Sequence, residues 1–153
     1  MIKKKPLEGR TLMTYAEFDE NLYTGNEMID TQHRELIDKI NRLLEVCESQ
    51  DGKLAALKML NYLSDYTDFH FAAEEKLQEE LEYPGIREHK AKHEELRNVV
   101  KELFEMLEEE EGPTDRFVEQ VNRNVTQWLY HHIKGFDRSV AEFANLRNNP
   151  DLL

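Results

Sequence analysis

Hydrophobic residues return along this chain at the spacing of an amphipathic α-helix, in four long blocks separated by short polar stretches. The blocks cover about residues 27–48, 53–82, 86–110 and 115–146. In the first block, Ile29, Leu36, Ile40 and Leu44 fall on one helical face, and the other blocks repeat this period. No segment alternates apolar and polar residues as a half-buried β-strand does. The pattern therefore predicts four amphipathic helices and no sheet.

Turn-forming residues mark the three connections between these blocks. They are Ser49-Gln50-Asp51-Gly52, Pro84-Gly85 and Gly112-Pro113. Asp51 and Thr114 stand where the N-caps of the second and fourth helices are expected, and Leu54 opens the apolar row of the second helix. Further along that row, either Phe69 or His70 takes the inward position. Three short connections between four long helices predict an all-α fold, an antiparallel up-down-up-down four-helix bundle.

The bundle is expected to occupy residues 27–146, with an N-terminal arm before it and a short tail after it. The arm, residues 1–26, contains several large apolar side chains, so we expect it to pack on the bundle. These side chains are Tyr15, Phe18, Leu22 and Tyr23. The tail covers residues 147–153. A chain of 153 residues is long enough for one domain with a core of its own.

The charge of the chain is strongly negative, with 20 basic and 32 acidic residues and a net charge of −12. A nucleic-acid partner and an anionic membrane surface are both disfavoured, because no basic stripe is present to meet phosphates. The opening MIKKKPLEGR lacks the apolar run of a signal peptide, and no segment approaches the ~20 apolar residues of a membrane span. The single cysteine, Cys47, permits no internal disulfide. We therefore expect a cytoplasmic protein and, with charged outer faces, a monomer.

Five of the six histidines lie in the four predicted helices, mostly beside a carboxylate or another histidine. They form the set His33, His70 with Glu74, His89 with His93, and His132 with Asp137. Imidazole and carboxylate together suit iron, zinc or manganese. Seven such groups are too many for one ion and about right for two ions that share carboxylates. The sixth histidine, His131, has no ligand-type residue four positions away and is expected at the surface.

The spacing of these residues supports a shared site, with one weak point. Residues four apart lie about 40° apart around a helix, so His70 with Glu74 and His89 with His93 can each face one ion. His132 and Asp137 are five apart, which is about 140° around an α-helix and a poor fit. Along an up-down bundle, however, all five histidines fall toward the same end. Large apolar residues accompany them and would exclude water: Leu36, Phe71, Trp128, Leu129 and Ile133.

Four motifs, IDTQH, HFAAEE, HKAKH and HIKGFD, occur in this order over about residues 12–145, and in this the chain resembles the hemerythrins, specifically the bacterial single-domain members. The resemblance implies reversible O2 binding at a non-haem di-iron centre with an oxo or hydroxo bridge, in a carrier, storage, delivery or sensing protein and not an enzyme. One iron would take His89, His93 and His132; the other would take His33 and His70 and keep an open position for O2. Glu74 and Asp137 would bridge the two ions.

The same resemblance makes the five apolar residues Leu36, Phe71, Trp128, Leu129 and Ile133 the O2 pocket. The family also uses the five-residue spacing of His132 and Asp137 that helical geometry alone disfavours. One departure is Phe18, which stands where bacterial members often have a tryptophan; we expect it to alter the packing of the arm and not iron binding. A protein partner for delivery or signalling is left open.

Three alternatives remain at this stage. A ferritin-like di-iron oxidase or peroxidase would need two Glu-x-x-His motifs, and this chain has none, although turnover of peroxide or NO as a side activity is open. A histidine phosphotransfer module would use the stretch from His131 to Gly135, but it leaves five histidines unexplained. Zinc or manganese could occupy the same ligand types, although two sites sharing carboxylates suit iron better.

Overall fold

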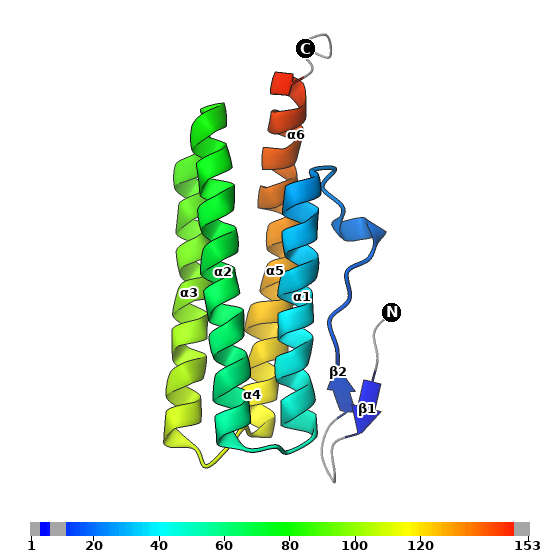
Figure 1. Ribbon diagram of the computed structural model, residues 1–153, viewed down its shortest axis with the longest axis vertical. Helices are drawn as coiled ribbons and strands as arrows, with labels where there is room; N and C mark the ends of the chain where they lie inside the picture. The colour runs from blue at the N-terminus through cyan, green and yellow to red at the C-terminus, as the bar shows by residue number, and fades with distance from the viewer. Residues whose placement is uncertain (1–3, 7–11, 149–153) are drawn as a thin grey trace.

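The structure, a computed structural model, describes residues 4–6 and 12–148 of the chain. Four helical rods stand side by side and alternate in direction, which confirms the predicted all-α up-down-up-down bundle with an N-terminal arm (Figure 1). The first three rods are α1 (Glu27–Glu48), α2 (Lys53–Leu81) and α3 (Ile86–Glu109). The fourth runs through five consecutive segments, α4 (Asp115–Gln120), η2 (Val121–Thr126), α5 (Gln127–His132), η3 (Ile133–Asp137) and α6 (Arg138–Asn148). Two of these segments, η2 and η3, are π-helical.

The helix ends follow the turn-forming residues that the sequence places there. Thr114 caps the fourth rod, because its hydroxyl accepts a hydrogen bond from the backbone N–H of Phe117 at 3.2 Å. The prediction for Asp51 was wrong, since Gly52 occupies the N-cap of α2 and no side chain caps this helix. Gly52 has a φ of 96°, a conformation open to glycine and costly for other residues, so the sharp turn takes precedence over a side-chain cap.

The apolar core fills the bundle between its four rods, with Leu43, Leu60 and Leu103 at 1% exposure or less. The prediction for Leu54 was wrong, because this side chain is 83% exposed. Leu60 lies about 240° around α2 from Leu54, so burial of the one leaves the other on the outer side. The choice between Phe69 and His70 is settled in the same way: Phe69 is 58% exposed and His70 is fully buried.

The arm lies along the bundle beside α1 (Figure 1). It contains a short antiparallel strand pair, β1 (Lys4–Pro6) with β2 (Leu12–Thr14), and a single 3-10 turn, η1 (Glu20–Leu22). The apolar pattern did not predict the strand pair, since three residues are too few to show alternation. Tyr15 and Leu22 are buried against the helices, whereas Tyr23 is 48% exposed.

Hydrogen bonds hold this arm to the first and fourth rods. The Asn41 side chain accepts from the backbone N–H of Ala16 at 2.7 Å and donates to its carbonyl at 2.9 Å. The backbone N–H of Glu17 donates to the Tyr130 hydroxyl at 2.8 Å. The Arg138 guanidinium donates to backbone carbonyls of η1 and the residues after it. The expectations for the first residues of the arm and for the tail beyond residue 148 lie outside the described residues.

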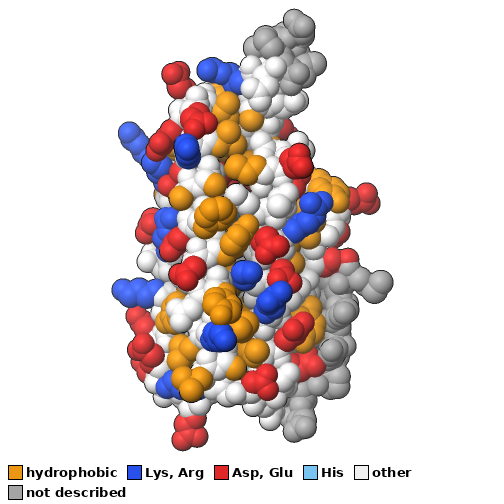
Figure 2. Space-filling view, in the orientation of Figure 1, with side chains coloured by type: hydrophobic (Ala, Val, Ile, Leu, Met, Phe, Trp, Pro, Cys, Tyr) orange, Lys and Arg blue, Asp and Glu red, His pale blue; other side chains and the backbone are white. Residues whose placement is uncertain are grey.

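The outer surface mixes charges of both signs with scattered apolar side chains over the face that α2 and α3 form (Figure 2). Surface ion pairs one helical turn apart, such as Glu35 with Lys39 at 3.6 Å and Asp38 with Arg42 at 2.9 Å, are part of this pattern. Among the helices of the described residues, none is long and apolar enough to cross a membrane.

Candidate metal centre

Seven side chains from all four rods meet inside the bundle, and they are the seven that the sequence singles out. They form two groups whose nitrogen and oxygen atoms lie within 4.8 Å of one another in each group. One group holds Glu74, His89, His93, His132 and Asp137; the other holds His33, His70, Glu74 and Asp137. His132 is 4% exposed and the other six are fully buried. The two carboxylates belong to both groups, so the arrangement has the form of two adjoining sites with shared ligands.

The π-helical turn η3 brings Asp137 to the same face as His132. In a π-helix the backbone hydrogen bond joins residues five apart, so residues with this spacing lie one turn from each other. The Nε2 atom of His132 is accordingly 3.1 Å from Oδ1 of Asp137. The spacing that an α-helix would disfavour is therefore accommodated by one widened turn, and π-helical turns often occur at functional sites.

Each shared carboxylate touches histidines of both groups. Glu74 Oε1 lies 2.7 Å from His89 Nε2, while its Oε2 lies 3.1 Å from His70 Nε2. Asp137 Oδ1 lies 2.9 Å from His89 Nε2, and its Oδ2 lies 2.7 Å from His33 Nε2. The carboxylates on α2 and η3 therefore each stand between the two groups of histidines.

Many of the inward-facing atoms lack a hydrogen bond although they are buried. Among the described residues these atoms include Nε2 of His33, His70 and His93, both oxygens of Glu74, and Oδ2 of Asp137. Some lie close to a neighbour, as His33 Nε2 does to Asp137, but without the geometry of a hydrogen bond. Buried polar atoms without partners are costly and call for a ligand. Imidazole nitrogens and carboxylate oxygens directed at common points fit divalent transition-metal ions, iron included.

The protonation of the cluster reflects the same need for positive charge. Burial alone would lower the pKa of His89, but its close contacts with the carboxylates of Asp137 and Glu74 raise this pKa to about 9. Burial, together with the neighbouring His89 and His132, lowers the pKa of His93 to about 2. Burial would raise the pKa of Asp137, yet His132, Glu74 and His33 hold it well below its usual value. The carboxylates of the cluster therefore favour a cationic partner beside them, a role that a metal ion can take over.

Three of the clustered histidines each have a polar side chain from outside the cluster at Nδ1, the ring nitrogen that faces away from the cluster. Gln32 Oε1 lies 2.7 Å from Nδ1 of His70, and Glu75 Oε2 lies 2.7 Å from Nδ1 of His93. The Gln78 amide lies 3.0 Å from Nδ1 of His89. Rotation of the Gln78 amide exchanges its oxygen and nitrogen. With the amide oxygen facing Nδ1 of His89, this Nδ1 would carry the proton and Nε2 of His89 would be free to bind a metal.

The sequence motifs did not single out these three residues. Gln32 and Glu75 are sequence neighbours of the predicted ligands His33 and Glu74, and Gln78 lies one turn after Glu74. Their proximity in sequence to the predicted ligands was the one signal that could have pointed to them. It did not identify them, because many other polar residues flank the same motifs and only the packing of the rods brings these three to a histidine.

Apolar and aromatic side chains enclose the cluster. Of the predicted pocket residues, Leu36, Leu129 and Ile133 are at most 2% exposed. Phe71 is fully buried and stacks on the His93 ring, with 3.7 Å between centroids and 5° between planes. Partly exposed Trp128 stacks on the His132 ring, with a centroid distance of 4.5 Å. The two aromatic residues thus pack on imidazoles of the first group.

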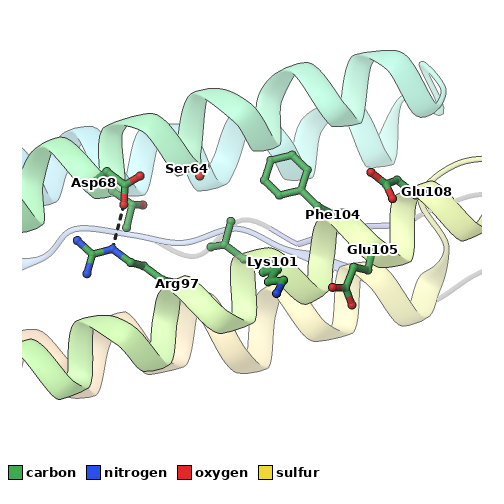
Figure 3. A pocket seen from close by; sticks show the side chains of 9 residues that line it. Ser64, Asp68, Arg97, Lys101, Phe104, Glu105 and Glu108 are labelled. Atoms are coloured by element: carbon green, nitrogen blue, oxygen red, sulfur yellow. Dashed lines mark hydrogen bonds and ion pairs between the residues drawn. The ribbon is translucent and has the colours of Figure 1, made fainter.

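A groove of about 490 Å³ runs along the outside of α2 and α3, beyond the cluster (Figure 3). Its floor includes Val100 and Phe104, and an ion pair of 3.0 Å between Arg97 and Asp68 closes one end. The Arg97 guanidinium also lies over the Phe71 ring at 5.2 Å. Arg97 therefore lines the groove and also covers the outer side of the Phe71 ring, which stacks on His93.

The sequence model of the Hemerythrin HHE cation binding domain matches residues 24–144, a range that contains all seven clustered residues. The chain belongs to the hemerythrin family. The bacteriohemerythrin of Stenotrophomonas maltophilia is 32% identical to it over 130 residues, which are 85% of this chain and 82% of that protein. The bacteriohemerythrin of Pseudomonas aeruginosa is 33% identical over 132 residues, with the same shares of the two chains.

Solved hemerythrin structures share the fold of this family member. A crystal structure of wild-type hemerythrin aligns with a TM-score of 0.71 at 24% identity, covering 82% of this chain and 95% of that chain. This likeness supports the helical-bundle architecture. Together with the family match, it places the buried cluster of histidines and carboxylates in a protein family of metal-binding helical bundles.

Proposed function

We propose that this hemerythrin binds O2 reversibly at a non-haem di-iron centre inside the bundle, as a carrier, store, delivery protein or sensor of oxygen. The observation that carries the proposal is the pair of buried ligand groups that share Glu74 and Asp137. Two groups with two common carboxylates suit two ions held next to each other. The bacteriohemerythrin names of the relatives favour iron and O2 over other metals and ligands.

In this proposal, His89, His93 and His132 hold one iron, and His33 and His70 hold the other. Glu74 and Asp137 contact both. When bound, the pair of ferrous ions supplies the electrons and the open coordination position that reversible O2 binding requires. The half with two histidines has fewer protein ligands, so O2 is expected there.

The protein would support this chemistry in three ways: it offsets the charge of the metal ions, orients the imidazole rings and excludes water from the site. Two carboxylates balance half of the charge of two divalent ions, which lowers the cost of burying them. Leu36, Leu129 and Ile133 are expected to line the O2 pocket, where apolar walls admit a small apolar gas and keep water out. Phe71 and Trp128 restrict the neighbouring imidazoles by stacking on them. By slowing the entry of water, these residues would protect a bound pair of ferrous ions from irreversible oxidation.

We also propose that binding, and not catalysis, is the main role. All seven clustered side chains are at most 4% exposed, so a substrate larger than a diatomic molecule has no surface on which to meet them. An oxidase acting on organic substrates needs such access. A peroxidase or NO-handling activity, in which the reactant is small, is the alternative that the experiment below must separate from O2 carriage.

Three further expectations belong to the same proposal. Residues 27–146 form the functional bundle, with the arm of residues 1–26 and the tail of residues 147–153 as additions. The charged surface and the net charge of −12 favour a monomer. A cytoplasmic location stays a prediction.

The test is a visible absorption spectrum of the purified protein, reduced without air and then exposed to it, with iron counted in the same sample. We expect two irons per chain, a nearly colourless reduced form, and a visible charge-transfer band in air that disappears when O2 is removed. Direct conversion to a stable ferric spectrum without that reversible band would contradict O2 carriage and favour the oxidase or peroxidase alternative.

Two neighbouring histidines provide a matched pair of variants for this test. His132→Ala removes a buried member of the cluster, whereas His131→Ala changes an exposed residue that lies outside both ligand groups. We expect His132→Ala to lower the iron content and abolish the reversible band, and His131→Ala to leave both unchanged. Loss of iron in His131→Ala would show that the assignment in the fourth rod is wrong.

A further inference from the structure

The hydrogen bonds behind the histidines differ in charge between the two halves of the cluster. Neutral amides approach Nδ1 of His70 and of His89, from Gln32 and Gln78. A carboxylate, Glu75, approaches Nδ1 of His93. Among the described residues, neither His33 nor His132 has a hydrogen-bond partner at its Nδ1. The half that contains His93 is therefore the one with an anionic second contact.

The ring of His93 is fixed so that its two nitrogens have different tasks. Phe71 stacks flat on one face of the ring, with 5° between the planes. Nδ1 lies 2.7 Å from Glu75 Oε2, so its N–H donates to this carboxylate. Nε2 then carries the lone pair; it faces the cluster, 4.0 Å from Glu74 Oε1, and has no hydrogen bond. The contact with Glu75 thus selects the tautomer that can bind a metal through Nε2.

A carboxylate acceptor changes the imidazole more than an amide does. A charge-assisted hydrogen bond is stronger than a neutral one, and it draws the N–H proton away from the ring. The other nitrogen becomes a more basic ligand as a result. The side chain of His93 is fully buried and that of Glu75 is only 20% exposed, so little water weakens this contact.

We propose that Glu75 is a positioning residue that makes the half formed by His89, His93 and His132 the tighter of two metal sites. The inference rests on the proposed dinuclear centre and adds the order in which its two sites bind and release metal. This half fills first when metal is added and empties last when metal is withdrawn. The half formed by His33 and His70, which has only the neutral Gln32 behind it, fills second.

The experiment is a titration of the full-length, metal-free protein with Co2+ under argon, followed by visible absorption. Co2+ accepts the same ligands and reports each filled site through its absorption bands, so the titration does not depend on O2 binding. We expect two steps in the unaltered protein. In Glu75→Gln, the tighter step should weaken about 10–100-fold, the usual effect of losing such an outer contact, while the second step stays in place.

Two further variants separate charge from position. Gln at position 75 can still accept the hydrogen bond from His93, whereas Glu75→Ala removes both the bond and the charge and should weaken the first step at least as much. Glu80→Gln removes the same charge from an exposed position on the same helix and should change neither step. In the Zn2+-loaded protein, the proton NMR signal of the His93 Nδ1–H should move upfield in Glu75→Gln, a change that a purely structural role would not produce.

The outcomes distinguish this inference from the proposed function. If the unaltered protein takes up fewer than two Co2+ ions per chain, the dinuclear centre itself is wrong and this inference falls with it. If it takes up two ions but Glu75→Gln matches the unaltered protein, as Glu80→Gln should, the inference alone is overturned. The same holds if Glu75→Gln weakens both steps equally.

Discussion

Replacing Gly135 with alanine tests whether the π-helical turn between His132 and Asp137 is strained. Gly135 lies within η3 and is exposed. Apart from its chain neighbours and the adjoining backbone of its own helix, no atom lies within 4 Å of the place where a Cβ would stand. Its φ is not in the left-handed region, so alanine can adopt the same backbone. Alanine lowers the conformational entropy of the unfolded chain, and the exchange should stabilise the fold by about 0.5–1 kcal/mol.

That gain corresponds to a measurable change in melting temperature. In a chain of this length, 1 kcal/mol shifts Tm by roughly 2–4 °C, so Gly135→Ala should raise Tm by about 1–4 °C. The assay is thermal unfolding followed by circular dichroism, on the metal-free protein, with iron content measured on a separate sample. The iron content should not change, because Gly135 is exposed and lies outside both ligand groups.

Gly52→Ala is the matched control. The space around Gly52 is also open, but its φ of 96° and ψ of 179° belong to a region that is nearly restricted to glycine. Alanine there should cost about 1–3 kcal/mol and lower Tm. If Gly135→Ala also lowered Tm, or if it reduced iron content, the π-helical turn would depend on glycine. Such a result would refute the expectation that alanine can adopt this backbone without strain.

Two other predictions concern the cluster and the fourth rod. Since the pKa of His89 is about 9 and that of His93 about 2, His89 is charged at pH 7 and His93 is already neutral, so metal uptake should release roughly one proton from His89. Calorimetry of metal binding in two buffers with different ionisation enthalpies measures this release, and identical heats in both would contradict it. The buried hydroxyl of Thr126 has no hydrogen-bond partner among the described residues, so Thr126→Val should raise the free energy of unfolding by about 1 kcal/mol. Urea unfolding should show a higher midpoint with an unchanged slope, and a lower midpoint would indicate that the hydroxyl is bonded after all.

The sequence was sufficient for the helices because their signals are local and repeated. The predicted helix blocks and the observed helices differ by at most two residues at any end. The seven cluster residues were also accessible, since each motif carries its own helical spacing and the bundle topology brings the four motifs to one level. The ligand roles of these residues remain a proposal that the metal experiments test.

Other features depend on tertiary packing and could not be predicted in this way. The π-helical turn before Asp137 cannot be seen in a period analysis that assumes one helix geometry throughout. Leu54 counts as apolar wherever it stands, and only the rotation of α2 shows that it faces outward. Gln32, Gln78 and Glu75 became functional candidates only when the structure showed which of many polar residues reach a histidine.

The contacts of the arm have a consequence for how the bundle opens. Loops join each rod to the next, but no loop joins the fourth rod back to the first. The interface between the fourth and first rods, called the seam below, is therefore the one that no connecting loop closes. The arm spans this seam. Asn41 on α1 forms hydrogen bonds with the backbone of Ala16, and Tyr130 and Arg138 on the fourth rod form hydrogen bonds with the backbone on either side of η1. The arm's hydrogen bonds connect the rod that carries His33 to the rod that carries His132 and Asp137, and these bonds can break and re-form. Amide exchange at this seam, rather than at the looped ones, should therefore report how often the buried cluster becomes accessible to solvent.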